Sequence, residues 1–163
     1  MKQLWSPWRM TYIESRDSEL GCLFCNLWNA APGPASLVLH KEARAFVVLN
    51  RYPYTNGHVM VAPQAHVASL EDLDPAALAD LMALTQRCLR ALRRAYEAES
   101  FNIGANIGAP AGAGVVDHVH LHVVPRWAGD TNFMATTAET RVIPEDLERT
   151  FQRLDEAWRA LPA

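Results

Sequence analysis

The sequence lacks a hydrophobic run long enough to cross a membrane, although half of its 163 residues are hydrophobic. Residues 1–5 do not form the apolar core of a signal peptide. Cysteine is scarce, and three cysteines, an odd number, do not build a disulfide framework. These absences lead us to expect a cytoplasmic protein that has no membrane partner.

The sequence also lacks an excess of positive charge. It has 15 Lys and Arg residues against 18 Asp and Glu residues, a formal net charge of −3, whereas nucleic-acid-binding domains carry a basic face. We therefore expect no nucleic-acid partner, but a nucleotide remains compatible because a few local donors can bind its phosphates. The chain contains no internal repeat, and its length suits one domain.

Half of the six histidines lie in one short stretch, where His118, His120 and His122 are separated by single hydrophobic residues. Strand side chains alternate between two faces, so an extended backbone would place the three imidazoles on one face. Such a row could be the polar face of an edge strand or a set of metal ligands. A Gly-rich segment that includes Gly112 and Gly114 precedes it, and glycine lets backbone amides approach a phosphate closely. The combination indicates chemistry on a phosphate.

Hydrophobic periodicity and turn residues predict the secondary structure. We expect strands at 36–40, 45–50, 58–63, 101–107 and 118–125. Asp74 as N-cap and Pro75 at the first position start a long helix whose apolar stripe ends at Tyr96. A final helix is expected to begin at Pro144. The order predicts an α+β fold, an antiparallel meander sheet with one long helix packed on it and a C-terminal helix.

Two of the three cysteines, Cys22 and Cys25, have the Cys-x-x-Cys spacing of a zinc knuckle. Redox motifs and incidental pairs share this spacing, but the βαβ context of a redox motif is absent. Zinc would need two further ligands. Cys88 lies inside the long expected helix and is interpreted as a small core residue.

The histidine stretch, His-Val-His-Leu-His-Val-Val at 118–124, resembles the His-φ-His-φ-His-φ-φ signature of the histidine triad (HIT) family of nucleotide hydrolases and transferases. Residues 50–63, with their Asn, Gly-His and Pro, are similar to the family's earlier hairpin. Residues 4–10 and 125–133 resemble a bacterial branch that includes diadenosine tetraphosphate phosphorylases (ATP adenylyltransferases). The resemblance covers nearly the whole chain and implies a HIT-like fold.

The resemblance implies one domain over residues 1–163, in which an N-terminal segment at 1–30 precedes a HIT core at 31–135 and a C-terminal helix at 136–163. It also implies a homodimer built by a sheet that extends across two subunits. Family members with the N-terminal Cys-x-x-Cys complete a zinc site with a His after the hairpin's Pro and with the first triad His. Those positions are His66 and His118, so a structural zinc bound by Cys22, Cys25, His66 and His118 is implied.

The same resemblance assigns catalytic roles. His120, the middle histidine, would attack the α-phosphorus and carry a covalent AMP group. His122 and His58 would donate hydrogen bonds to the non-bridging oxygens. Taken alone, His58 is more simply a polar residue that ends a turn, but Gly57-His58 in this context favours the functional role.

Four further positions are candidates for nucleotide binding. By resemblance, Asn50 contacts the adenosine ribose and Asn106 a phosphate or the leaving group, although both could be local turn residues. Arg126 and Asn132 follow the triad and could contact the second nucleotide or an acceptor phosphate. They could equally belong to a surface loop.

The chain departs from the family's hydrolases at residues 112–117, Gly-Ala-Gly-Val-Val-Asp, where those enzymes have a Gln and a hydroxyl residue. Phosphate contacts would then come from the amides of Gly112 and Gly114 or from Asn106. This favours a nucleotidyl transferase that uses inorganic phosphate to convert diadenosine tetraphosphate to ADP and ATP. The alternatives are a hydrolase of dinucleoside polyphosphates or adenosine phosphoramidates, and a non-catalytic, zinc-stabilised module that binds an adenine nucleotide.

Overall fold

The structure is a computed structural model that describes residues 21–130 and 145–162. Its elements, in chain order, are α2 (Leu23–Asn29), β1 (Val38–Lys41), β2 (Ala45–Leu49), β3 (Val59–Pro63), α3 (Pro75–Tyr96), β4 (Ser100–Gly104), β5 (Leu121–Arg126) and α5 (Leu147–Arg159), with short 3-10 turns η1 (Leu70–Asp72) and η2 (Ala109–Ala111). No helix in the described residues is long and apolar enough to span a membrane. The motif at residues 4–10 lies outside them.

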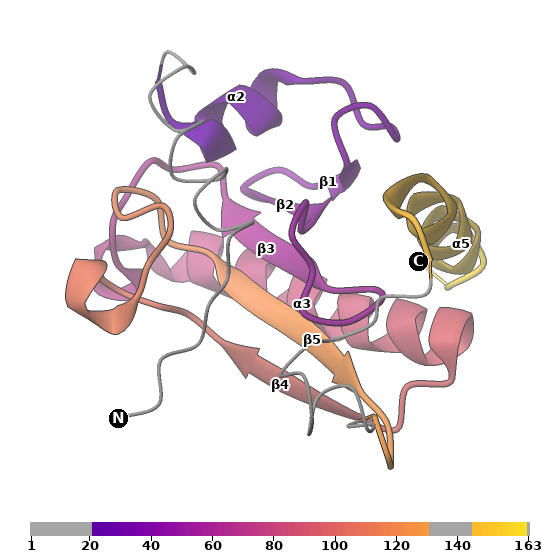
Figure 1. The fold of residues 1–163 in the computed structure, drawn as a ribbon. Helices are drawn as coiled ribbons and strands as arrows, with labels where there is room; N and C mark the ends of the chain where they lie inside the picture. Colours follow the sequence, from indigo (N-terminus) through magenta and orange to yellow (C-terminus); the bar gives the residue numbers. More distant parts are fainter. Residues whose placement is uncertain (1–20, 131–144, 163) are drawn as a thin grey trace, which may run out of the picture.

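The five strands form one antiparallel sheet in the order β1-β2-β3-β5-β4. The first three strands follow one another as a meander. Helix α3 then carries the chain to the far edge, where β4 lies, and β5 returns between β4 and β3 (Figure 1). The predicted α+β fold is confirmed, and the return of β5 brings the end of the triad beside β3.

Helix α3 begins as the sequence predicts. The Asp74 carboxylate accepts a hydrogen bond of 2.8 Å from the Ala77 N–H, and Pro75 occupies the first turn. Its buried residues recur at helical spacing, Leu81, Leu84, Cys88 and Leu92 among them. This face packs on β2, β3 and β5, while α5 packs against α3 and β1. The burial of Cys88 agrees with its interpretation as a core residue.

Four predicted boundaries are wrong by two residues or more. Strand β1 begins at Val38 rather than at 36, and β4 ends at Gly104 rather than at 107. The other two differ for a local reason. The triad strand begins at Leu121 rather than at 118, because the Val119 N–H donates to the Val67 carbonyl (2.8 Å) and so pairs with a loop. The last helix begins at Leu147, because the Asp146 carboxylate caps it by accepting from the Arg149 N–H (2.8 Å). Pro144, where we expected that helix to start, lies outside the described residues.

Candidate active site and metal centre

The turn before β3 and the strand β5 bring two predicted histidines into contact. His58 directly precedes β3, and Met60 of β3 pairs with His122 of β5, so the two rings meet across neighbouring strands. His58 Nε2 lies 2.9 Å from His122 Nδ1. Gly57 makes the preceding turn possible, because it has a φ of +77° and an added Cβ would lie 2.8 Å from a Leu92 side-chain atom.

Hydrogen-bond partners fix which nitrogens of this pair carry protons. The Tyr54 backbone N–H donates to His58 Nδ1 at 3.1 Å, so Nδ1 is an acceptor and the proton of His58 sits on Nε2. That proton is donated to His122 Nδ1. A neutral His122 has one N–H proton, which is therefore on its Nε2 and makes that nitrogen a hydrogen-bond donor.

Electrostatics keep both rings neutral. Burial lowers the pKa of His58 to about 3, with smaller contributions from the nearby rings of His122 and His120. Burial also lowers the pKa of His122 to about 4, again assisted by His120. At neutral pH the two imidazoles are thus an uncharged, directionally hydrogen-bonded pair.

His120 is held in a different way. Its ring is 5% exposed, and its Nδ1 lies 3.0 Å from the His118 carbonyl oxygen. A carbonyl can only accept, so Nδ1 carries the proton and Nε2 keeps a lone pair. Burial lowers the pKa of His120, which favours this neutral form. A neutral imidazole with one nitrogen anchored and the other basic has the form that a nucleophile requires.

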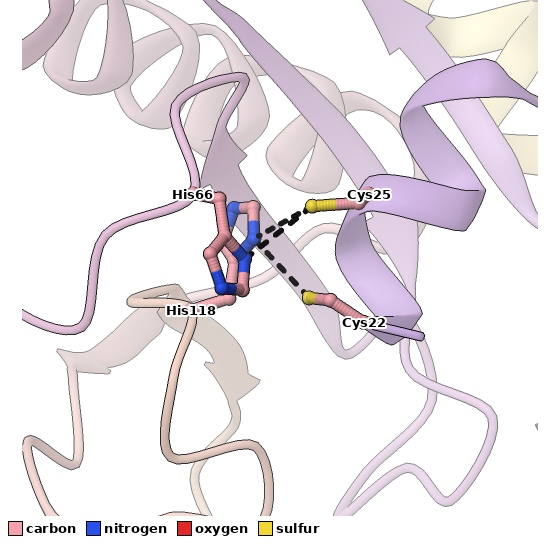
Figure 2. Close-up of side chains that lie close together, drawn as sticks. All are labelled: Cys22, Cys25, His66 and His118. Atoms are coloured by element: carbon pink, nitrogen blue, oxygen red, sulfur yellow. Dashed lines mark hydrogen bonds between the residues drawn. The ribbon is translucent and has the colours of Figure 1, made fainter. Parts of the chain in front are cut away.

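Two cysteines and two histidines converge beside this site (Figure 2). Cys22 and Cys25 come from the start of α2, His66 from the loop after β3, and His118 from the segment before β5. Their ligand atoms all lie within 4.8 Å of one another. Cys22 Sγ and Cys25 Sγ lie 3.4 and 3.7 Å from His118 Nδ1, and Cys25 Sγ lies 3.4 Å from His66 Nδ1. The structure thus brings together the four residues predicted as metal ligands.

The donor set and its spacing fit a tetrahedral metal ion. Zinc bonds of about 2.3 Å to sulfur and about 2.0 Å to nitrogen put neighbouring ligand atoms about 3.5 Å apart. His118 Nε2 donates to the Pro63 carbonyl (2.9 Å), which leaves Nδ1 as the atom that faces the sulfurs. Burial and the neighbouring Cys22 raise the pKa of the Cys25 thiol. A bound cation would offset the repulsion between two thiolates.

Two predicted nucleotide contacts are engaged in local hydrogen bonds. Asn50 Oδ1 accepts from the Tyr52 N–H at 2.9 Å, while its Nδ2 lies 3.4 Å from His58 Nδ1. Asn106 Nδ2 donates to the Gly112 carbonyl at 3.4 Å and so braces the glycine segment. Asn50 thus lies beside His58, whereas Asn106 contacts the glycine segment.

The glycine segment folds as a turn. The Gly112 N–H donates to the Ala109 carbonyl at 2.9 Å, with a φ of +86° that favours glycine. The amide of Gly112 is thus used inside η2, and this conformation does not offer it to a phosphate as we expected. Gly114 lies two residues further along, in the same segment before His118.

Arg126 is also held by local partners. Its guanidinium forms an ion pair with Asp130, in which Nη2 donates at 2.8 Å, and Nη1 donates to Asn102 at 3.0 Å. The following Trp127 packs edge-on against Tyr96 and donates to its carbonyl at 3.0 Å, as in the surface-loop interpretation. Asn132 lies outside the described residues.

Two aromatic residues at the site were missed from the sequence. Phe24, between the two cysteines, packs at 4.6 Å from His120 (ring centroids). Tyr54 is about half exposed and lies 4.6 Å from His58 and 5.9 Å from His122, nearly parallel to the latter. The sequence shows a large apolar residue inside Cys-x-x-Cys and an aromatic residue four positions before His58. Neither residue belongs to a periodic pattern, so the pattern analysis did not single it out.

Comparisons of the sequence and the fold find similar proteins. The HIT domain family matches residues 33–129. The chain is 36% identical over 169 residues to an AP-4-A phosphorylase of Mycobacterium tuberculosis, covering 99% of this chain and 87% of that protein. It is 38% identical over 136 residues to an uncharacterised HIT-like protein of the same species, covering 83% of this chain and 92% of that protein. A crystal structure of a Zn-bound histidine triad family protein from Mycobacterium smegmatis aligns with a TM-score of 0.69 at 33% identity, covering 85% of this chain and 94% of that chain.

Proposed function

This chain belongs to the histidine triad family, and we propose that it is a nucleotidyl transferase that cleaves dinucleoside polyphosphates through a covalent AMP–His120 intermediate. The observation that carries the proposal is the anchored, neutral His120, whose Nδ1 binds the His118 carbonyl and whose Nε2 keeps its lone pair. The similarity to an AP-4-A phosphorylase over 99% of the chain supports diadenosine tetraphosphate as the substrate.

Two displacements at the α-phosphorus account for the reaction. His120 Nε2 forms a bond to the phosphorus, the bond to the bridging oxygen breaks, and ATP leaves with that electron pair. An oxygen of inorganic phosphate then attacks the same phosphorus, the P–N bond breaks, and ADP is formed while His120 recovers its lone pair. Water as the acceptor would give AMP instead.

The histidine pair would stabilise the negative charge that develops on the non-bridging oxygens. His122 Nε2–H is the donor, because His122 Nδ1 already accepts from His58. Both nitrogens of His58 have partners inside the protein, so it orients His122 rather than contacting the phosphate itself. This revises the direct phosphate contact that the sequence suggested for His58.

We also propose that zinc occupies the centre formed by Cys22, Cys25, His66 and His118. The set of two sulfurs and two nitrogens and its spacing suit Zn²⁺, and the M. smegmatis relative is described as Zn-bound. With four protein ligands, zinc would have no open position for substrate, and it would hold α2 and the triad segment together.

A homodimer completes the proposal. β4 forms one edge of the sheet, and Ile103 on this strand is 46% exposed. The opposite edge strand, β1, is interrupted by a register shift and contacts α5, so it is the poorer edge for pairing. Pairing β4 with a second copy would extend the sheet and cover Ile103.

Product analysis tests the transferase. Diadenosine tetraphosphate is incubated with the protein over a titration of inorganic phosphate, and nucleotides are separated by chromatography. We expect ADP and ATP in equal amounts at millimolar phosphate, at a rate that rises with phosphate and saturates. AMP formed at a phosphate-independent rate would identify a hydrolase. Nucleotide binding without turnover would identify a non-catalytic module.

A further inference from the structure

Helix α2 is too short to be stable by itself. It has seven residues, and its N-cap, Cys22, makes no side-chain capping hydrogen bond. Isolated helices of this length are not stable in water, so tertiary contacts must hold it. Cys22 and Cys25 of the metal centre hold its first turn, and the Lys41 ammonium donates to the Trp28 and Ala30 carbonyls at its other end.

This helix buries one residue, Phe24, which is 1% exposed. The Phe24 ring lies 4.6 Å from the His120 ring, at an interplanar angle of 34°, and 5.2 Å from the His118 ring. It also packs edge-on against Phe46 of β2, at 6.3 Å. The ring thus contacts both a strand of the sheet and the proposed nucleophile.

Hydrogen bonding alone leaves the His120 ring incompletely fixed. The bond from Nδ1 to the His118 carbonyl sets one point of the imidazole, about which the ring can still tilt. Phe24 packs against the ring, and His122 contacts it edge-on at 5.0 Å. These two neighbours restrict the tilt of the His120 ring, and with it the direction of its Nε2 lone pair.

We propose that Phe24 is a positioning residue for His120 and that the metal-binding turn of α2 holds Phe24 in place. The metal centre would then serve the reaction as well as the stability of the fold, because Cys22 and Cys25 flank the residue that aligns the nucleophile. This inference rests on the proposed function. A misplacement of about 1 Å can lower a rate a hundredfold, which sets the size of the expected effect.

The test replaces Phe24 by Leu, which keeps an apolar side chain and removes the flat ring. We expect kcat to fall tenfold to a hundredfold, with KM within threefold of wild type and one metal ion retained per chain. The His120 signal in a long-range ¹H–¹⁵N spectrum, identified by its loss in His120→Gln, should shift, whereas the signals of His58 should not. If Phe24→Leu does not fold, Phe24→Met, which preserves more of the volume, takes its place.

Phe151→Leu is the matched control, because it removes the same atoms from a buried residue in α5, which lies outside the site. It should keep the wild-type kcat and His120 signal. Equal losses of kcat in the two variants would overturn the proposal, as would an unshifted His120 signal or loss of the metal from Phe24→Leu. If the wild type converts no adenine nucleotide, the proposed function fails, while the spectra still decide whether Phe24 positions His120.

Discussion

At the scale of single residues, hydrogen-bond partners decide what each histidine can do. The carbonyls that accept from His118 and His120 orient these rings in opposite ways, one with Nδ1 toward the sulfurs and the other with Nε2 free. His58 and His122 instead form a pair in which each proton has one defined position. These four imidazoles therefore have three different hydrogen-bonding arrangements, which the residue type alone does not reveal.

Replacing the nucleophile is the most direct test at this scale. His120→Ala should lower turnover of diadenosine tetraphosphate by several orders of magnitude, because it removes the nitrogen lone pair that attacks the phosphorus in the proposed reaction. Nucleotide binding, measured by calorimetry, and the thermal unfolding midpoint should change little. Activity within tenfold of wild type would exclude His120 as the nucleophile, and so would failure to trap a labelled adenylyl group on the wild-type protein.

The histidine pair also predicts how stability depends on pH. The folded-state pKa values of His58 and His122, about 3 and about 4, lie below the ordinary value near 6.5. Between the folded-state pKa and the ordinary pKa, the unfolded chain binds more protons than the folded protein does. The free energy of unfolding should therefore fall as the pH falls from 6.5 toward 4, by at most about 1.4 kcal/mol per pH unit for each ring.

Urea denaturation at intervals between pH 7.5 and 5 measures that slope. His58→Gln lacks one of the two rings, and its slope should be smaller than that of the wild type. In the wild-type protein, neither ring should titrate above pH 5.5 by NMR. An identical slope in both proteins, or a His58 pKa near 6.5, would contradict the neutral pair.

At the scale of elements, the candidate metal centre brings together three segments that are distant in the sequence. Helix α2, the loop after β3 and the segment before β5 each contribute candidate ligands to it. Its loss would release the N-terminal helix and the start of the triad segment together. The cluster is therefore expected to contribute to folding free energy as well as to the geometry of the site.

The proposed zinc site predicts the metal content of the protein and of its cysteine variants. Protein purified without chelators should contain one zinc ion per chain, and the double variant Cys22→Ala with Cys25→Ala should contain none. Its free energy of unfolding should fall by several kcal/mol, because structural zinc contributes directly to folding. Cys88→Ala is the control, since this buried cysteine lies in α3, apart from the cluster, and should keep the zinc. Elemental analysis without zinc, or a Cys22–Cys25 disulfide, would refute the site.

Turn residues and hydrophobic periodicity predict the elements that are determined by neighbouring residues in the sequence. The capped start of α3 and the positions of β2 and β3 agree with the sequence to within a residue, because turn residues and periodicity act over a few positions. Helix α2 and the late start of β5 could not be predicted in this way. The first involves contacts between Cys25 and histidines 41 and 93 residues away, and the second involves a hydrogen bond between Val119 and Val67.

At the scale of the whole molecule, the sheet has one covered edge and one that is more accessible. Helix α5 contacts β1, whereas α3 packs on β2, β3 and β5 (Figure 1). Residues 102–104 of β4 are exposed. An exposed edge strand with apolar side chains favours pairing with another chain. The proposed dimer would join two sheets at β4 and place two candidate sites on one continuous sheet.

We therefore expect a homodimer that depends on β4. Ile103→Glu should shift the protein to monomer in sedimentation velocity experiments, because the dimer would have to bury a charge at the sheet junction. Met82→Glu is the control: Met82 and Ile103 are each 46% exposed, but Met82 lies on α3, and its variant should remain dimeric. Circular dichroism establishes that both variants fold. A monomeric wild type at micromolar concentration, or an Ile103→Glu variant that sediments as a dimer, would show that β4 does not form the interface.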